Sequence, residues 1–189
     1  VRYPVADSDE HLIIATTRPE TNLADTGVAI HPDDERYSHL HGKRVLIPLV
    51  DREVPIIVDD YVDRELGTGA LKVTPAHDIN DYDIGQRHEL EVIDIFMDDG
   101  TINELGLHYH GQDRFKARKN IVRELEEKGF LVKVEDHHNN VGRSERTGAV
   151  VEPRLSLQWY VDMESLARPA LEAVMSDDIR FFPENMKNT

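Results

Sequence analysis

Four side chains that can bind or activate a polar substrate lie close together in one stretch of the sequence. Between Gly67 and Asp81 the chain reads GTGALKVTPAHDIND. Lys72 and Thr74 are two positions apart, so on a β-strand they point to the same face. After a proline turn come Asp78 and a second aspartate, at the end of the stretch. An ammonium, a hydroxyl and two carboxylates could therefore face one pocket.

The same residues also have explanations that need no ligand. A lone Lys-x-Thr pair most often forms the solvated face of a strand. Asp78 suits the N-cap of a helix, and Asp81 would complement the helix dipole from the first turn. Gly67 and Gly69 favour the functional alternative, because they allow a close backbone approach that a surface strand does not need. The lysine ammonium could also hold one carboxylate ionised.

A second polar stretch, Ala15–Thr21 (ATTRPET), comes earlier in the chain. It can be a plain strand end in which Pro19 fixes the exit. It also offers the hydroxyls of Thr16 and Thr17 beside the guanidinium of Arg18, a combination suited to a small polar ligand, a ribose or a phosphate. We expect this stretch to form the opposite wall of the same pocket.

Hydrophobic patterning predicts the elements that must position these residues. The predicted strands are Leu12–Thr16, Thr26–Ile30, Arg44–Ile47, Val54–Val58, Ala70–Thr74, Val92–Met97 and Phe130–Val134. The predicted helices are Asp34–Leu40, Ile79–His88, Arg114–Lys128 and Leu166–Met175, the last with a proline in its first turn. Strands outnumber helices and do not alternate with them, so we expect a β-rich, barrel-like α/β domain.

We expect two parts, a barrel-like core over residues 1–140 and a tail over residues 141–189 that returns the chain elsewhere. The sequence begins without methionine and ends on ENMKNT, which reads as a cut. We therefore expect a piece of a larger protein.

Composition restricts the classes of function. The chain has 189 residues, 39% of them hydrophobic, no cysteine and a net charge of −15. Disulfides and thiolate metal sites are excluded, and no apolar run approaches the roughly 20 residues of a membrane span. This fits a cytoplasmic protein. Such an acidic domain repels bulk nucleic acid, although Arg114–Lys119 and Arg143–Arg146 could admit a tethered nucleic-acid end.

The sequence lacks the catalytic motifs of several common enzyme classes. The chain has no Gly-x-Ser-x-Gly, P-loop or Gly-x-Gly-x-x-Gly motif, and no plausible Ser-His-Asp set. His108 and His110 could share one strand face, but no third metal ligand has a convincing spacing, so we expect no metal. Hydrolysis here would need a positioned water without a strong general base.

These motifs resemble the inserted editing (connective peptide 1) domain of class I aminoacyl-tRNA synthetases. The resemblance covers nearly the whole chain: TTRPET, GTGALKVTPAHDINDYDIGQRH, DIFMDDGTIN, RFKARKNIVRELEEKG and VVEPRLSLQWYVDM. The run from Lys72 to Asp78, followed by Asn80 and Asp81, looks like the form found in valyl-tRNA synthetases.

The resemblance implies a barrel-like domain inserted in a Rossmann catalytic core, which hydrolyses threonine wrongly attached to valine tRNA. It implies an aminoacyl-tRNA deacylase without aminoacylation activity of its own, because the catalytic-core signatures are absent. Expected partners are the 3′ end of aminoacylated valine tRNA and the rest of the parent chain, with no membrane and a monomeric fragment. No cofactor is expected, and Ser144 and Thr147 replace the cysteines that bind zinc in some relatives.

The family's pattern also implies roles for the first polar stretch. Asp81 should bind the aminoacyl ammonium group. Lys72, Thr74 and Asp78 should recognise the threonine hydroxyl and shape the pocket.

For the second stretch, the resemblance implies that Arg18 contacts the substrate from the opposite side. Thr16 and Thr17 should lie near the terminal adenosine or the attacking water. The candidate catalytic residues are therefore Lys72, Asp81 and Thr17, and the others bind substrate.

Two alternatives remain open. The site could have isoleucyl-type or leucyl-type specificity, although a pocket for an aliphatic side chain has less use for Lys72 and Thr74. The chain could also be a non-catalytic tRNA-binding insert.

Overall fold

A computed structural model describes the backbone of residues 1–188 and side chains as far as Lys187. The chain divides into two compact units, Val1–Leu155 and a second that begins at Ser156. The boundary expected at residue 141 is a different one, and it stays a prediction.

The first unit contains two small sheets. Strands β1 (Arg2–Pro4) and β2 (His11–Ile13) form an antiparallel pair. The second sheet has the order β4-β5-β3-β6, with bounds Arg44–Ile47, Arg52–Val58, Gly27–Ile30 and Ala70–Val73. Strand β3 is parallel to β5 and antiparallel to β6. The β-rich α/β character is confirmed, although the strands of residues 1–188 do not close into a barrel.

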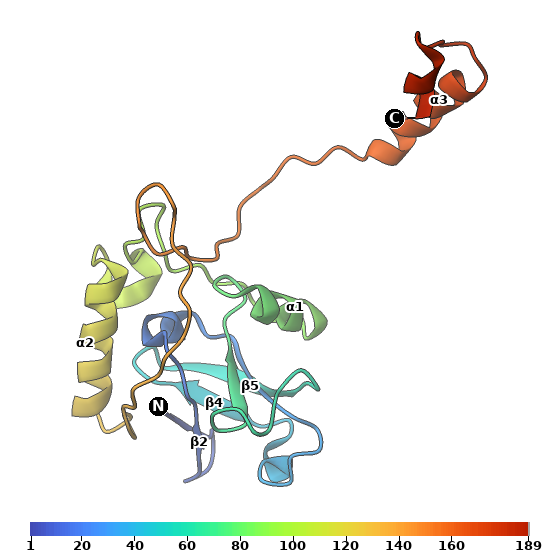
Figure 1. The fold of residues 1–189 in the computed structure, drawn as a ribbon. Helices are drawn as coiled ribbons and strands as arrows, with labels where there is room; N and C mark the ends of the chain where they lie inside the picture. The colour runs from blue at the N-terminus through green and yellow to red at the C-terminus, as the bar shows by residue number, and fades with distance from the viewer. Residues whose placement is uncertain (189) are drawn as a thin grey trace. The chain divides into compact units, whose positions relative to one another are not determined.

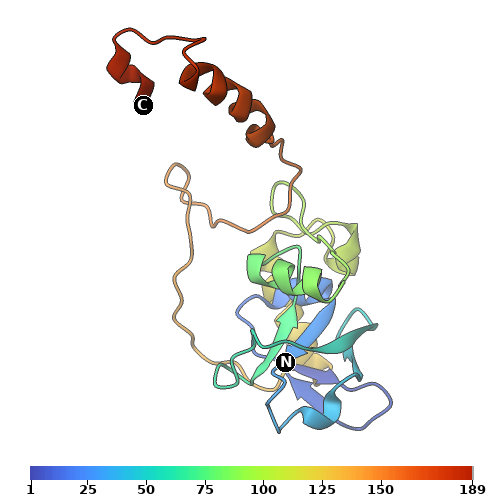
Figure 2. The ribbon, with the colours of Figure 1, turned by 90° about the vertical axis from the view of Figure 1, so that its right-hand side faces the viewer.

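Two helices of the first unit lie where the sequence predicts them. Helix α1 (Ile79–Arg87) follows β6, and Figures 1 and 2 show it at one end of the four-stranded sheet. Helix α2 (Arg114–Glu127) begins at Asp113, whose carboxylate accepts hydrogen bonds from the first-turn backbone. It buries Ile121 and Leu125 against the segment before it, which includes Ile95.

Some predicted elements do not form. The helix expected over Asp34–Leu40 shrinks to a 3₁₀ turn, η2 (Ser38–Leu40), because the Asp34 carboxylate binds the backbone N–H of Arg36 and competes with helix formation. The apolar runs Val92–Met97 and Phe130–Val134 are not strands. Ile93, Ile95 and Phe96 are nevertheless buried in the cluster that includes α2, and the first run has only an isolated antiparallel bridge, between Phe96 and Ile102.

Two further 3₁₀ segments complete the first unit, η1 (Pro19–Ala24) and η3 (Glu104–Tyr109). His108 therefore lies in a 3₁₀ turn, where its Nε2 is 2.7 Å from Glu124 Oε2. Residues 1–188 hold no group of three or more His, Cys, Asp or Glu side chains arranged for a metal ion.

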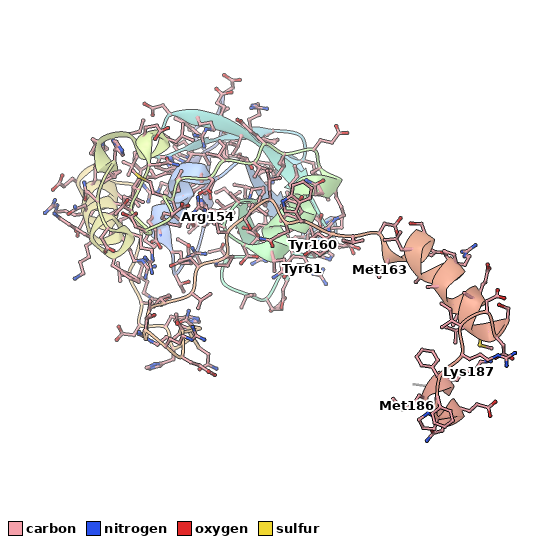
Figure 3. All side chains as sticks on the ribbon, turned by 90° about the horizontal axis from the view of Figure 1, so that it is seen from above. Tyr61, Arg154, Tyr160, Met163, Met186 and Lys187 are labelled. Carbon is pink, nitrogen blue, oxygen red and sulfur yellow. The ribbon has the colours of Figure 1, made fainter. Side chains whose placement is uncertain are left out.

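The second unit contains helix α3 (Met163–Met175) and the 3₁₀ segment η4 (Glu184–Asn188). Figure 3 labels Met163, where α3 begins, and Lys187, which pairs with Asp177. The helix starts before the predicted Leu166, so Pro169 lies in its interior and not in its first turn. None of the helices in the described chain combines the length and apolar character that a membrane crossing requires.

Candidate functional site

Lys72 of strand β6 and Thr74, the residue after the strand, lie on one face, as predicted, but that face is buried. Leu71 and Val73 pack into an apolar cluster with Ile84. Lys72 and Thr74 point the other way, and their relative solvent exposures are only 9% and 1%. The alternative of a solvated strand face is therefore wrong. The register that sets this alternation pairs Lys72 with Val28 of β3.

Both side chains contact the carboxylate of Asp25, a residue that the sequence pattern did not identify. Asp25 Oδ1 lies 2.9 Å from Lys72 Nζ and accepts a hydrogen bond of 2.7 Å from Thr74 Oγ1. Its Oδ2 accepts a hydrogen bond of 2.6 Å from the Tyr3 hydroxyl. Lys72 Nζ also donates to Thr74 Oγ1. An ammonium, two hydroxyls and a carboxylate thus form one buried polar cluster.

Asp25 is completely buried between the end of η1 and the start of β3. Burial raises the pKa of its carboxyl, while the Lys72 ammonium and the hydrogen bonds from Lys72, Tyr3 and Thr74 oppose that rise. The sequence offered one signal, a carboxylate two residues before a wholly apolar strand, where an unpaired charge would be costly.

Helix α1 carries Asp81 to the end of β6. Gly85 of this helix lies against Pro75, and a Cβ there would come within 2.7 Å of the proline ring. The close approach brings Asp81 Oδ2 within 2.9 Å of the Thr74 backbone nitrogen, which donates to it. Asp81 is 7% exposed.

Burial raises the pKa of Asp81 to about 6, and the Lys72 ammonium only partly offsets this. That Lys72 holds this carboxylate ionised stays a prediction. Asp78 is the N-cap of α1, because its carboxylate accepts hydrogen bonds from the backbone of Asn80 (2.8 Å) and Asp81 (3.3 Å). A substrate-binding role for Asp78 stays a prediction.

The two polar stretches do meet in the structure. Arg18 Nη1 donates a 2.9 Å hydrogen bond to the backbone carbonyl of His77, in the turn between β6 and α1. Thr16 Oγ1 accepts a 3.0 Å hydrogen bond from the Arg18 backbone, which shapes this end of the stretch. Thr17 is exposed. The direct contact through Arg18 is consistent with a single site.

His77 is a buried neutral imidazole. Its Nε2 accepts a hydrogen bond from the Ile95 backbone N–H (3.2 Å), and its ring packs on Phe96 with centroids 4.7 Å apart. Burial lowers the pKa of His77 to about 4, although Asp94 pulls the other way. Because Nε2 is an acceptor, the proton resides on Nδ1, which has no hydrogen-bond partner within the described residues.

Gly67 and Gly69 serve the loop before β6. Both have positive φ angles, +59° and +76°, that favour glycine. A Cβ on Gly69 would lie 2.4 Å from Arg36 Nη2 and 3.1 Å from the Arg64 carbonyl oxygen. The space that a side chain at position 69 would need is therefore occupied by Arg36 and by the backbone of Arg64.

A surface depression of about 530 Å³ shares Phe96 with the His77 contact. Its other lining residues are Met97, Asp98, Asp99, Asn103 and Arg154. Lys72, Thr74 and Asp81 do not line it. The buried polar cluster and the side chains of Arg18 and Asp81 therefore lie outside the lining of this depression.

Comparison with known proteins finds relatives among the aminoacyl-tRNA synthetases. Residues 33–114 match a family model described as leucyl-tRNA synthetase, editing domain. The chain is 58% identical over 189 residues, all of its length, to a valine–tRNA ligase of Clostridium tetani, of which it covers 22%. It is 58% identical over 184 residues to that of Thermotoga maritima, covering 97% of this chain and 21% of the relative. The chain thus spans about a fifth of these relatives.

Two solved structures share the fold. One is the ternary complex of Agrobacterium radiobacter K84 agnB2 LeuRS with tRNA and LeuAMS, with a TM-score of 0.56 and 24% identity over 68% of this chain and 18% of the other. The second, GlLeuRS-CP1, has a TM-score of 0.56 and 12% identity over 69% of this chain and 85% of the other.

Proposed function

This chain belongs to the editing domains of the class I aminoacyl-tRNA synthetases, and on that basis we propose that it removes threonine wrongly attached to valine tRNA. The reaction is hydrolysis of the ester between the amino acid and the terminal ribose. The proposed partners are the 3′ end of the mischarged tRNA and the rest of a longer synthetase chain, and the proposed location is the cytoplasm.

The buried cluster of Lys72, Thr74 and Asp25 carries this proposal. Threonine and valine differ by a hydroxyl in place of a methyl group. An apolar pocket rejects such an added hydroxyl poorly, and for valyl-tRNA synthetase and threonine the known limit is about a hundredfold. A pocket edged with hydrogen-bonding groups reverses the preference, because the threonine hydroxyl can make a hydrogen bond there that the valine methyl group cannot.

The other polar residues fit the remaining parts of an aminoacyl ester. An ionised Asp81 suits the substrate ammonium group, and Arg18 can donate to the ester or ribose oxygens from the other side. We assign Thr16 and Thr17 to the adenosine or the attacking water, and Asp78 to the rim of the pocket. In this scheme Lys72, Asp81 and Thr17 are the catalytic residues.

Hydrolysis proceeds through a positioned water. The water oxygen bonds to the ester carbonyl carbon, the bond to the ribose oxygen breaks, and a proton from the water ends on that oxygen. The products are free threonine and intact tRNA. An aminoacyl ester is reactive, so orientation supplies much of the acceleration.

Single-turnover deacylation, with the chain in excess over tRNA, tests the proposal. Thr-tRNA(Val), Val-tRNA(Val) and Val-tRNA(Ile) are compared, and spontaneous hydrolysis is subtracted. We expect Thr-tRNA(Val) to react at least tenfold faster than the other two. Faster hydrolysis of Val-tRNA(Ile) would indicate isoleucyl-type specificity, and no hydrolysis of any substrate would identify a non-catalytic insert.

A further inference from the structure

Glu152 makes a direct ion pair with Arg18 from far along the chain. Its Oε2 accepts a hydrogen bond from Arg18 Nη2. Glu152 is also within hydrogen-bonding distance of a second guanidinium, because its Oε1 lies 3.0 Å from Arg114 Nε. Its side chain is only 17% exposed. One carboxylate therefore bridges an arginine of the site and the first residue of α2.

The segment that carries Glu152 is attached on both sides of it. Arg114 Nη2 donates to the Val150 carbonyl oxygen at 3.2 Å. Arg154, labelled in Figure 3, pairs with Asp98 and lies 3.4 Å from Asp94 Oδ2. These contacts restrict the position of the Glu152 carboxylate, so it offers Arg18 a hydrogen-bond acceptor at a defined position.

A second carboxylate, that of Glu20, also lies near Arg18. Glu20 is fully buried and receives two hydrogen bonds from Arg118, of 2.7 and 2.6 Å. Arg18 Nε lies 3.9 Å from the same carboxylate. Together with the His77 carbonyl, these groups define the guanidinium plane. A guanidinium has five N–H donors, and the hydrogen bonds to His77 and Glu152 use two of them.

We propose that Glu152 is a positioning residue for editing: it orients the Arg18 guanidinium so that its remaining donors meet the substrate. This inference rests on the proposed deacylation. Losing the carboxylate would leave a long, flexible side chain to be ordered in each encounter, and small misplacements of a substrate-binding group reduce rates by about ten- to a hundredfold.

A double-mutant cycle on deacylation of Thr-tRNA(Val) by the chain tests this assignment. We expect Glu152→Ala to lower kcat/KM at least tenfold. In the Arg18→Ala background the same change should have less than a twofold effect, because no guanidinium is left to orient. Glu152→Gln, which keeps one oxygen acceptor, should fall between wild type and Glu152→Ala.

Two further variants separate positioning from folding. Glu53→Ala removes an exposed carboxylate 3.4 Å from Arg44, and should leave kcat/KM unchanged. Arg114→Met removes the second anchor of Glu152 without altering Arg18, and should reduce kcat/KM in the same direction as Glu152→Ala. Urea midpoints identify any variant that loses stability, in which case the cycle is run with Glu152→Gln.

The outcomes distinguish this inference from the function on which it rests. If the unmodified chain fails to hydrolyse Thr-tRNA(Val), the proposed function is wrong. If it hydrolyses the ester but the effects of Glu152→Ala and Arg18→Ala are multiplicative, Glu152 does not act through Arg18. A rate increase in Glu152→Ala would show that the ion pair restrains Arg18 from its substrate, and would also overturn the assignment.

Discussion

The Lys72 ammonium lies 2.9 Å from the Asp25 carboxylate, although 47 positions separate the two residues in the sequence. Both side chains are largely buried, with 10% and 0% exposure. Such a pair need not add stability, but removing one member leaves an uncompensated charge in the interior. The cluster is therefore sensitive to single substitutions.

Replacing Asp25 should destabilise the fold through that unpaired charge. We expect Asp25→Ala to lower the free energy of unfolding by about 3–5 kcal/mol. The double variant Asp25→Ala/Lys72→Met should recover part of this loss, because the buried ammonium is also gone. Urea unfolding at pH 7 measures both. A loss below about 1 kcal/mol in Asp25→Ala would contradict the buried ion pair.

Replacing Lys72 should remove the preference for threonine. We expect Lys72→Met, which keeps the length of the side chain, to slow hydrolysis of Thr-tRNA(Val) about ten- to a hundredfold, because a hydrogen bond to a charged group is worth about 1.5–3 kcal/mol. Slow hydrolysis of Val-tRNA(Val) should change little. Equal losses on both substrates would mean that Lys72 does not read the hydroxyl.

The titration of Asp81 should appear in substrate binding. With a pKa of about 6, this carboxyl is mostly protonated at pH 5 and mostly ionised at pH 7. Only the ionised form attracts the substrate ammonium, so KM for Thr-tRNA(Val) should be about tenfold higher at pH 5 than at pH 7. Asp81→Asn should raise KM at pH 7 and abolish the difference. A wild-type KM that is the same at both pH values would contradict this role.

His77 should make the fold sensitive to acid. Its pKa is about 4 in the folded chain and 6.5 ordinarily, so between these values the unfolded chain binds a proton that the folded chain does not. The contribution of His77 to stability therefore falls by about 2 kcal/mol between pH 7 and pH 5. Asp81 works in the opposite direction, because its raised pKa stabilises the fold as pH falls from 6 toward 3.8.

The variant His77→Gln isolates the histidine contribution, because it keeps an acceptor for the Ile95 N–H and leaves Asp81 in place. Between pH 7 and pH 5, the free energy of unfolding should fall by about 2 kcal/mol less in the variant than in the wild type. Thermal melts at the two pH values provide the comparison. Parallel pH dependence in the two proteins would place the histidine in a solvated environment.

The sequence predicted local features well. Alternation placed Lys72 and Thr74 on one face at the end of β6, and the short polar side chain of Asp78 identified the start of α1. These features depend on neighbours a few residues away. The pocket roles inferred from the family's pattern remain predictions.

The sequence predicted long-range polar pairing poorly. Asp25 and Glu152 carry no local mark of their partners, since an acidic residue in a turn or loop is ordinarily solvated. Their contacts form only in the folded chain, where β3 pairs with β6 and where Arg114 of α2 binds Glu152. The missing strand at Val92–Met97 has a related cause, because burial and strand pairing favour the same apolar residues.

The pairing of β3 with β6 has a consequence for sequence change. Lys72 faces Asp25 only while it stays opposite Val28, and a slip by one position would turn Lys72 outward and bring Leu71 and Val73 into its place. A change in the length of a surface loop outside β3 and β6 leaves this register in place, whereas a single insertion within Ala70–Thr74 would exchange the polar face of Lys72 and Thr74 for an aliphatic one. Discrimination between amino acids would then depend on the fidelity of strand alignment.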